Sequence, residues 1–329
     1  MADSTRTLTY VAALNEAFHQ AMSADPSVII LGENIRRGVR AETRGLDEAF
    51  GDDRVIDMPI SEAAFTGYAT GAALEGLRPV VEFQVASLMF PAFDQIVNQA
   101  AKLPLMLGGQ RHIPVTYLVM GAGAGGGRAG QHSDNPYAFL IHAGIKTVYP
   151  SNGHDVKGLM LSAIRENDPV ALIAPATLLG HESEVPEAPY EIPFASGATR
   201  RRGRDVTVVA VGHLVNDALS VADTLEQAGI SVAVWDPRTL FPLDKQGLVE
   251  AVAETGRVVF FDDSTRTCGF AAELMSVVCE RGFKHLKASP QRVTRAEATI
   301  AYSTDIEQAT LPTRTRLERA IRHLLEAGQ

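Results

Sequence analysis

The sequence has few cysteines, a deficit of cationic side chains and no long apolar run. Only two of its 329 residues are cysteines, Cys268 and Cys279, which excludes a disulfide framework and fits a reducing compartment. Acidic residues outnumber basic ones by 39 to 30, which argues against a nucleic-acid-binding surface. No apolar segment approaches the roughly 20 residues of a membrane span, and residues 1–7 lack the apolar core of a signal peptide. We therefore expect a cytoplasmic protein without membrane or nucleic-acid partners.

Apolar residues make up 46% of the chain, and their pattern predicts two α/β domains. Short β-branched runs alternate with amphipathic segments, as in doubly wound parallel sheets. We expect domains over 1–175 and 205–329, joined by a linker over 176–204 without regular elements. Within that linker, the basic run 200–202 is expected in a solvated turn. The expected strands are 28–31, 79–83, 114–119, 146–149, 170–173, 206–211, 231–235 and 258–261, and the expected helices are 9–23, 61–75, 87–101, 135–142, 153–165, 214–228, 244–254, 269–281 and 312–326.

A glycine-rich segment, 121–130, follows the expected strand 114–119. Gly121, Gly123 and Gly126 match the dinucleotide-binding spacing G-x-G-x-x-G. However, no acidic residue ends the next strand, and the lysine of a P-loop is absent. A flexible loop, or one that another group approaches closely, is favoured over a nucleotide site. Because it follows the carboxyl end of a strand, the segment lies where open α/β sheets bind ligands.

Two titratable residues begin or precede expected helices. Ser61 can cap the helix 61–75, so that Glu62 falls in its first turn, where the helix dipole favours an anion. His132 follows the glycine-rich segment and has the pKa range suited to proton transfer. From spacing alone, a helix-start acid is the favoured interpretation of Glu62, and for His132 a hydrogen-bonded loop histidine is at least as good an interpretation as a catalytic one. Small residues, which permit close approach of another backbone, recur every four positions in the same helix: Ala63, Gly67 and Gly71.

Six segments, in order along nearly the whole chain, carry a combined pattern: IDMPISE (56–62), GLRPVVEF (76–83), FDQIVNQAAK (93–102), QHS (131–133), KGL…SAIR (157–165) and RTLFPL (238–243). Together they resemble the beta subunits of thiamine-diphosphate-dependent 2-oxoacid dehydrogenases. This group includes pyruvate, branched-chain 2-oxoacid and acetoin dehydrogenases. The resemblance implies an α/β chain with a pyrimidine-binding domain and a transketolase C-terminal-like domain. It also implies oxidative decarboxylation of a 2-oxo acid and acyl transfer to lipoyl groups.

Alternatives to this function remain open at the level of sequence. An acyloin-cleaving or acyloin-forming enzyme subunit, such as that of an acetoin dehydrogenase, is the main one. A split transketolase half is less favoured because Ile60-Ser-Glu62 resembles the dehydrogenase version of that motif. Two further alternatives are an NAD-binding oxidoreductase and a partner subunit without catalytic activity.

The resemblance also implies roles for individual residues. Glu62 would hydrogen-bond the N1′ nitrogen of the cofactor's aminopyrimidine, and His132 would face the substrate and the lipoyl arm. Ile60, Gln84 and Leu88 would contact the pyrimidine, although the family usually has an aromatic residue at the position of Leu88. A structural potassium ion is implied at a further set of positions: Val115, Ala163, Ile164, Glu166 and Asp168.

The implied partners follow from what the chain does not contain. It has no G-D-G signature for the diphosphate and Mg²⁺, which points to an alpha subunit that supplies those ligands. The resemblance implies an alpha2-beta2 heterotetramer with a second beta chain, and docking of a dihydrolipoyl acyltransferase. An apolar stripe in the helix 312–326 is expected to serve assembly, with packing inside its own domain as the alternative: Leu317, Ile321, Leu324 and Leu325.

Overall fold

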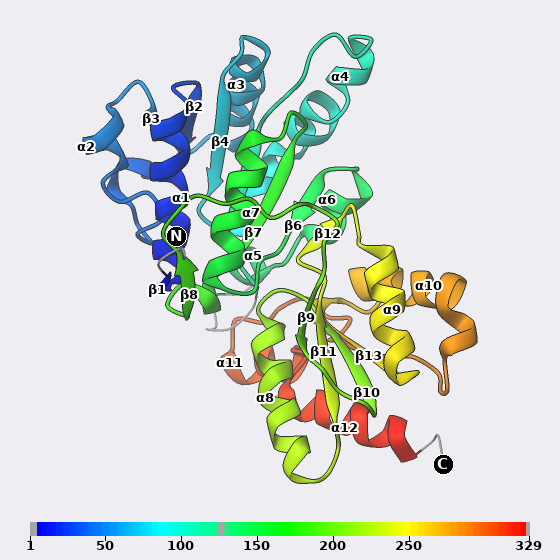
Figure 1. Cartoon of the computed structure of the whole chain (residues 1–329). Coiled ribbons are helices and arrows are strands. Elements are labelled where there is room, and N and C mark those ends of the chain that lie inside the picture. The colour runs from blue at the N-terminus through cyan, green and yellow to red at the C-terminus, as the bar shows by residue number, and fades with distance from the viewer. Residues whose placement is uncertain (1–4, 124–127, 129, 327–329) are drawn as a thin grey trace. The chain divides into compact units, whose positions relative to one another are not determined.

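The computed structural model describes residues 5–123, 128 and 130–326 and divides the chain into two compact units. Unit 1 comprises the chain up to Gly123 together with Phe139–Phe194, and unit 2 comprises 124–138 and 195–329. Each unit is an α/β fold, which confirms the predicted fold class (Figure 1). Gly126, the third glycine of the dinucleotide-like spacing, lies outside the described residues. In the part of the chain that is described, no helix has the length and apolar character needed to cross a membrane.

Unit 1 is built on a parallel sheet whose strands follow the order β6 (Lys146–Val148), β7 (Val170–Pro175), β5 (Thr116–Ala122), β4 (Arg78–Phe83), β2 (Val28–Gly32) and β3 (Val55–Asp57). One face packs against α1 (Tyr10–Ala24) and α7 (Gly153–Arg165), with Ile30, Val80 and Leu118 in that core. On the other face, Phe83 contacts Phe65 of α3 (Glu62–Leu74), with 5.9 Å between ring centroids. Because the strands are parallel, the segments after β2, β3, β4 and β5 leave the same edge of the sheet, where ligands bind in open α/β sheets.

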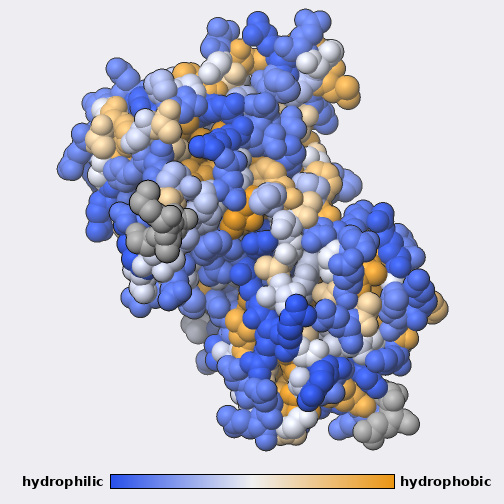
Figure 2. Space-filling model, viewed as in Figure 1, coloured by the Kyte–Doolittle hydropathy of each residue, from blue (hydrophilic) through white to orange (hydrophobic). Residues whose placement is uncertain are grey.

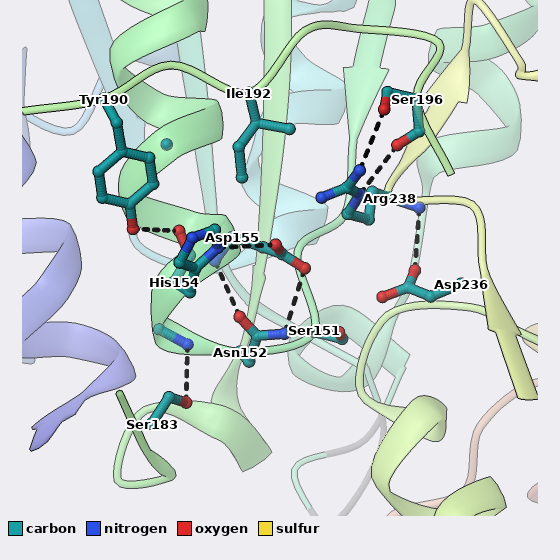
Figure 3. Close-up of polar contacts among 12 residues, drawn as sticks. Ser151, Asn152, His154, Asp155, Ser183, Tyr190, Ile192, Ser196, Asp236 and Arg238 are labelled. Carbon is teal, nitrogen blue, oxygen red and sulfur yellow. Dashed lines mark hydrogen bonds and ion pairs between the residues drawn. The ribbon is translucent and has the colours of Figure 1, made fainter. Parts of the chain in front are cut away.

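Side-chain hydrogen bonds fix the beginning of α7 (Figure 3). Asn152 Oδ1 accepts from the Asp155 N–H at 2.8 Å, and Asn152 Nδ2 donates to the buried Asp155 carboxylate at 3.1 Å. Ser183 Oγ accepts from the Gly153 N–H at 3.0 Å, and the Tyr190 hydroxyl donates to the His154 carbonyl at 2.7 Å. The helix start is therefore bonded to the segment 183–190, which sequence reasoning placed in a linker.

Lys157 and Gly158, two adjacent residues of the KGL motif at the centre of α7, are both required by the packing of this helix. A Cβ atom on Gly158 would lie 2.7 Å from Ile192 Cγ1 and 2.8 Å from the Tyr190 ring, too close for any side chain. Lys157 is fully buried, and its ammonium donates to Glu16 Oε1 at 2.6 Å. The pair thus lets the segment 190–194 cross the helix closely, and it is not available to a ligand.

Some expected elements differ in the structure. The helix expected over 87–101 is a 3₁₀ segment, η2 (Ala86–Ala92), and a π-helical segment, η3 (Gln95–Ala100). Pro91 accounts for the break, because it cannot donate the backbone hydrogen bond of an α-helix. The expected linker contains β8 (Glu182–Pro186), which pairs antiparallel with β1 (Thr5–Thr9). Four of its five residues are polar or proline, so the sequence carried no apolar strand signal.

Unit 2 has the strand order β14 (Gln291–Arg295), β13 (Val258–Thr265), β10 (Val206–Ala210), β11 (Val232–Asp236) and β9 (Ala198–Arg201), with only β9 antiparallel. The solvated turn expected at the basic run was wrong for Arg200 and Arg201, whereas Arg202 follows the strand and is exposed. Arg200 is in β9, with its guanidinium 2.8 Å from the buried Asp236 carboxylate, and Arg201 pairs with Asp223 and Glu226 at 2.5 Å.

Four further helices of unit 2 begin and end near their expected positions: α8 (Leu214–Gln227), α9 (Lys245–Thr255), α10 (Phe270–Gly282) and α12 (Arg314–Glu326). The apolar stripe of α12 packs inside the unit. Leu317, Ile321 and Leu324 are at most 2% exposed and share a core with β10, β11 and β13. The expectation that this stripe serves assembly was therefore wrong, because its side chains are already covered. The remaining described elements are η1 (Ile35–Arg37), α2 (Leu46–Phe50), α4 (Leu103–Met106), α5 (Gly130–Ser133), α6 (Tyr137–His142), η4 (Ala176–Leu178), β12 (Thr239–Phe241), η5 (Phe283–His285) and α11 (Thr304–Thr310).

Candidate active site

Glu62 is the first residue of α3 and follows the carboxyl end of β3. It is only 9% exposed, and the helix dipole stabilises a carboxylate at this position. Ser61 is the N-cap residue, but its hydroxyl donates to the Pro59 carbonyl at 3.1 Å instead of capping the helix. The Ser61 carbonyl accepts the N–H groups of Ala64 and Phe65. The position of Glu62 agrees with the sequence analysis, whereas the predicted side-chain cap was wrong.

Gln84 lies just beyond β4, and its side-chain nitrogen is held by two protein oxygens. Nε2 donates to Glu82 Oε1 at 2.7 Å and to the Glu33 carbonyl at 3.2 Å. The amide oxygen is therefore the end of this side chain that can accept a hydrogen bond from a ligand. The Gln84 backbone carbonyl accepts from the Arg40 guanidinium. Gln84 is thus fixed at both its backbone and its side chain.

Buried carboxyl groups surround this amide. Glu82 is 1% exposed and Glu42 is fully buried. When both groups are ionised, no donor in the described part of the chain reaches Glu82 Oε2 or either carboxyl oxygen of Glu42, whereas a protonated Glu82 can donate to Glu42. Burial, followed by the charge of Glu42, raises the pKa of Glu82 well above its ordinary value. Glu82 therefore retains a proton at a pH where an exposed glutamate has lost it.

The pKa of a third carboxyl group, that of Glu33, depends on the charge of Glu62. Burial, followed by the negative charge of Glu62, raises the pKa of Glu33. Glu33 Oε1 is also buried without a donor among the described residues. An orphaned carboxyl oxygen of this kind can accept a hydrogen bond from a ligand N–H group. The sequence analysis missed Glu33, Glu42 and Glu82. The available signal was that Glu33 and Glu82 lie at the carboxyl ends of the neighbouring strands β2 and β4.

Apolar side chains next to this polar group are exposed. Ile60, two residues before Glu62, is 82% exposed, and Leu88 in η2 is half-buried. Phe90 and Phe139 are also exposed and meet edge to face, with 5.6 Å between centroids. Large exposed apolar groups beside polar ones are typical of binding surfaces.

A second apolar surface lies at α4. Leu105 and Met106 are 86% and 73% exposed, and Figure 2 shows hydrophobic side chains at the surface in this part of unit 1. Two of the three small residues of α3, Ala63 and Gly71, are exposed, and Gly67 is half-buried. At Gly67 the face is approached by η3, since a Cβ atom there would lie 2.9 Å from Gln95 Oε1.

The described beginning of the glycine-rich segment borders Gln84. Gly121 has φ +64°, and a Cβ atom there would lie 3.2 Å from Arg40 Nη2 and 3.3 Å from the Gln84 carbonyl. A side chain at this position would be strained and would crowd the contact between Arg40 and Gln84. Gly121 therefore has a structural role in fixing Gln84, which favours the close-approach interpretation over a dinucleotide turn.

His132 lies in unit 2, whereas Ile60, Glu62, Gln84 and Leu88 lie in unit 1. It is exposed in the short helix α5. The residues that follow it are buried, with Ser133 at 1% and Asn135 at 6% exposure. A solvent-accessible imidazole next to an anchored backbone is an arrangement suited to proton transfer.

The oxygens of the implied potassium site already accept hydrogen bonds from cations of this chain. Arg78 Nη1 donates to the backbone carbonyls of Ile164 and Glu166, both at 3.0 Å. Lys146 Nζ lies 2.9 Å from Glu166 Oε2 and 2.8 Å from Asp168 Oδ2. These residues do not form a site that requires a metal cation, so we derive no step through a potassium ion. The other two members of the set use their carbonyls in backbone hydrogen bonds: Val115 and Ala163.

Two family models match the chain in sequence. The pyrimidine-binding domain of transketolase matches residues 6–181, and the C-terminal domain of transketolase matches residues 195–317. Among solved structures, a split-gene transketolase described as an inactive beta4 tetramer has a TM-score of 0.78 at 21% identity, covering 98% of this chain and 99% of that one. A transketolase from Pichia stipitis has a TM-score of 0.68 at 16% identity, and the match covers 99% of this chain but 46% of the transketolase. These similarities establish the fold.

Curated relatives match the chain over almost its whole length. The beta subunit of acetoin:2,6-dichlorophenolindophenol oxidoreductase from Cupriavidus necator is 39% identical, covering 98% of this chain and 99% of the relative. The pyruvate dehydrogenase E1 beta subunit of Rickettsia felis is 37% identical, with coverage of 96% and 97%. The 2-oxoisovalerate dehydrogenase beta subunit of Pseudomonas aeruginosa is 36% identical, with coverage of 99% and 97%. The predicted resemblance is confirmed: the chain belongs to the transketolase-like family of beta subunits of thiamine-diphosphate-dependent 2-oxoacid and acetoin dehydrogenases.

Proposed function

We propose that this chain binds the aminopyrimidine of thiamine diphosphate and, with an alpha subunit, oxidatively decarboxylates a 2-oxo acid and transfers the acyl group to a lipoyl group. The observation that carries the proposal is the polar group at the sheet edge: a carboxylate at the start of α3, a fixed amide and a buried carboxyl oxygen without a donor. An aminopyrimidine has an amino group that donates to such acceptors, and its ring nitrogen can donate to a carboxylate once it is protonated. The residues present therefore fit this cofactor.

Each residue has a distinct part in this proposal. Glu62 holds a hydrogen bond to the ring nitrogen and favours the tautomer that can take up a proton. Gln84 offers its amide oxygen to the amino group, and Ile60 and Leu88 supply apolar contact. When bound, thiamine diphosphate supplies the carbon acid and electron sink that decarboxylation requires. His132 holds and transfers a proton near the substrate during acyl transfer.

The diphosphate and Mg²⁺ are proposed to be bound mainly by the alpha subunit. Among the described residues, no group of three or more His, Cys, Asp or Glu side chains could hold a metal ion. The exposed Ile60 near Glu62 and the exposed Ala63 and Gly71 of α3 support a partner at this surface. We propose an alpha2-beta2 heterotetramer in the cytoplasm that delivers acyl groups to a dihydrolipoyl acyltransferase.

A second candidate substrate is an acyloin. Acetoin enzymes are the relatives at 39% and 37% identity in Cupriavidus necator and Bacillus subtilis. Cleavage of acetoin would use the same proton-holding residues, since the cofactor is unchanged. The two candidates differ in the substrate that the complete enzyme consumes.

Reconstitution with an alpha subunit tests the proposal. The chain should be assembled with the alpha subunit from its own organism and assayed with pyruvate, 2-oxoisovalerate and acetoin, using 2,6-dichlorophenolindophenol as electron acceptor. We expect turnover with one substrate class, and none without the alpha subunit. Calorimetry should show thiamine diphosphate and Mg²⁺ binding tightly only to the assembled protein. Micromolar or tighter binding to this chain alone would contradict the proposed division between the subunits.

A further inference from the structure

A buried ion pair in unit 2 contacts the segment that carries His132. Arg295 on β14 and Asp263 on β13 are 4% and 2% exposed. The Asp263 carboxylate accepts from Arg295 Nε at 3.1 Å, and from Nη2 at 2.9 and 2.8 Å on its two oxygens. The remaining terminal nitrogen, Nη1, donates to the Ser133 carbonyl at 3.3 Å. One guanidinium therefore joins two strands of the sheet to the residue that follows His132.

The same strands hold the segment at two further points. Asn135 Nδ2 donates to Asp263 Oδ2 at 3.2 Å, and both side chains are buried. The Tyr137 hydroxyl donates to the Asp262 carboxylate, and the Tyr137 ring meets Phe270 edge to face, with 6.5 Å between centroids. Alternate residues of 133–137 are thus anchored, and His132 extends from the anchored end.

The positive charge beside the Asp263 carboxylate comes from Arg295 and not from the neighbouring His213. His213 Nε2 lies 4.0 Å from Asp263 Oδ2, but burial lowers the pKa of His213, so that it is neutral at pH 7. A buried ion pair contributes little net stability compared with apolar residues of the same size. What it does provide is fixed geometry, because the planar guanidinium bonds to a carboxylate and a carbonyl at once.

We infer that Arg295 and Asp263 are positioning residues that hold the Ser133 carbonyl and thereby set the place of the His132 imidazole. The inference rests on the proposed function in that it takes His132 as the proton-transferring group in acyl transfer. Both side chains are buried and bond to the segment at Ser133 and Asn135, so their effect is expected to pass through the segment and not through direct contact with a substrate. Lysine at position 295 would keep the charge beside Asp263 but has a single nitrogen, so it cannot also reach the Ser133 carbonyl with the same geometry.

Two assays of the enzyme assembled with its alpha subunit separate the steps. In the dye-linked assay, 2,6-dichlorophenolindophenol accepts electrons without lipoyl transfer. In the lipoamide-linked assay, the acyl group must pass to a lipoyl group. Arg295→Lys should lower kcat with lipoamide by about 10–100-fold, the scale for misplacing a catalytic group by an ångström. Its dye-linked kcat should stay within about threefold, and His132→Ala should show the same selectivity.

Arg200→Lys is the matched control. Arg200 also pairs with a buried aspartate, Asp236, which lies on β11 and not in the segment 133–137. This variant should leave both assays unchanged. Hydrogen exchange of the peptide 130–138, measured by mass spectrometry, should be faster in Arg295→Lys and unchanged in Arg200→Lys. If Arg295→Lys does not fold, Tyr137→Phe, which removes the bond to Asp262 and keeps the ring, should show the same selective loss.

The outcomes distinguish this inference from the proposed function. Equal loss in the two assays, no loss in either, or unchanged exchange of 130–138 would overturn the positioning role. Loss in Arg295→Lys with His132→Ala fully active would overturn it as well, because the effect would not pass through His132. Wild-type enzyme inactive in both assays would refute the proposed function, whereas the exchange measurement would still decide whether Arg295 anchors the segment.

Discussion

Replacing Glu42 with glutamine should stabilise the protein and reduce the dependence of its stability on pH. In the wild type, burial and the Glu42 carboxyl raise the pKa of Glu82 above its ordinary 4.5. The folded state therefore binds more protons than the unfolded state from about pH 4.5 up to that raised pKa, and the free energy of unfolding falls as pH rises through this window. Glu42→Gln removes the like charge and provides an amide N–H donor to Glu82.

The expected magnitude follows from the burial of both groups. A hydrogen bond to a charged partner contributes about 1.5–3 kcal/mol. For a unit of this size, 1 kcal/mol corresponds to roughly 2–4 °C in Tm. Glu42→Gln should therefore raise Tm by roughly 3–12 °C where Glu82 is ionised, and the gain should shrink as the pH falls and Glu82 becomes protonated.

Differential scanning calorimetry from pH 5 to 8.5 measures this directly. Glu48→Gln, the same substitution at an exposed glutamate of α2, is the control and should shift Tm equally little at every pH. Parallel curves of Tm against pH for wild type and Glu42→Gln would refute the reasoning, because they would mean that Glu82 titrates without influence from Glu42.

Three further changes test the site and its supporting structure. Glu62→Gln should lower turnover of the assembled enzyme by about 10²–10⁴-fold. Glu75→Gln, at the other end of α3, is the control and should leave turnover unchanged. An unchanged rate of cofactor C2 hydrogen exchange in Glu62→Gln would contradict the role of Glu62. Gly158→Ala should lower Tm by roughly 2–12 °C despite alanine's better helix propensity, because overpacking against Ile192 costs about 1–3 kcal/mol. A rise in Tm would contradict this. Exchanging NaCl for KCl at equal ionic strength should change Tm by less than about 1 °C, because Arg78 already donates to the relevant carbonyls; a potassium-specific rise would show that an ion binds there.

Much of unit 1 could be predicted because its signals are local. The strand 79–83 is apolar and β-branched, and the structure has β4 at Arg78–Phe83. Glu62 could be placed at a helix start from the preceding proline and serine alone. The strand β8 could not be predicted from the sequence, because its residues are mostly polar and its stability comes from pairing with β1, which is far away in the sequence. Local pattern thus predicts elements that bury their own side chains.

The groups around the candidate site were harder to predict because they depend on tertiary contact. Glu42 lies in an irregular segment with no chemical pattern, and only the fold brings it beside Glu82. The contact from Arg295 to Ser133 spans 162 residues of sequence. His132 could be proposed from its motif, but the groups that hold its backbone could not, since a single sequence carries no record of such pairing.

The assignment of residues 124–138 to unit 2 has a consequence for recombination between relatives. A chimaera that joined residues 1–194 of this protein to the carboxyl-terminal part of a paralogue would respect both family models in sequence. It would nevertheless separate the His132 segment from the arginine and aspartates that hold it in this protein. Chimaeras that keep activity should therefore take 124–138 and 195–329 from the same parent protein, although the two segments are separated in the sequence.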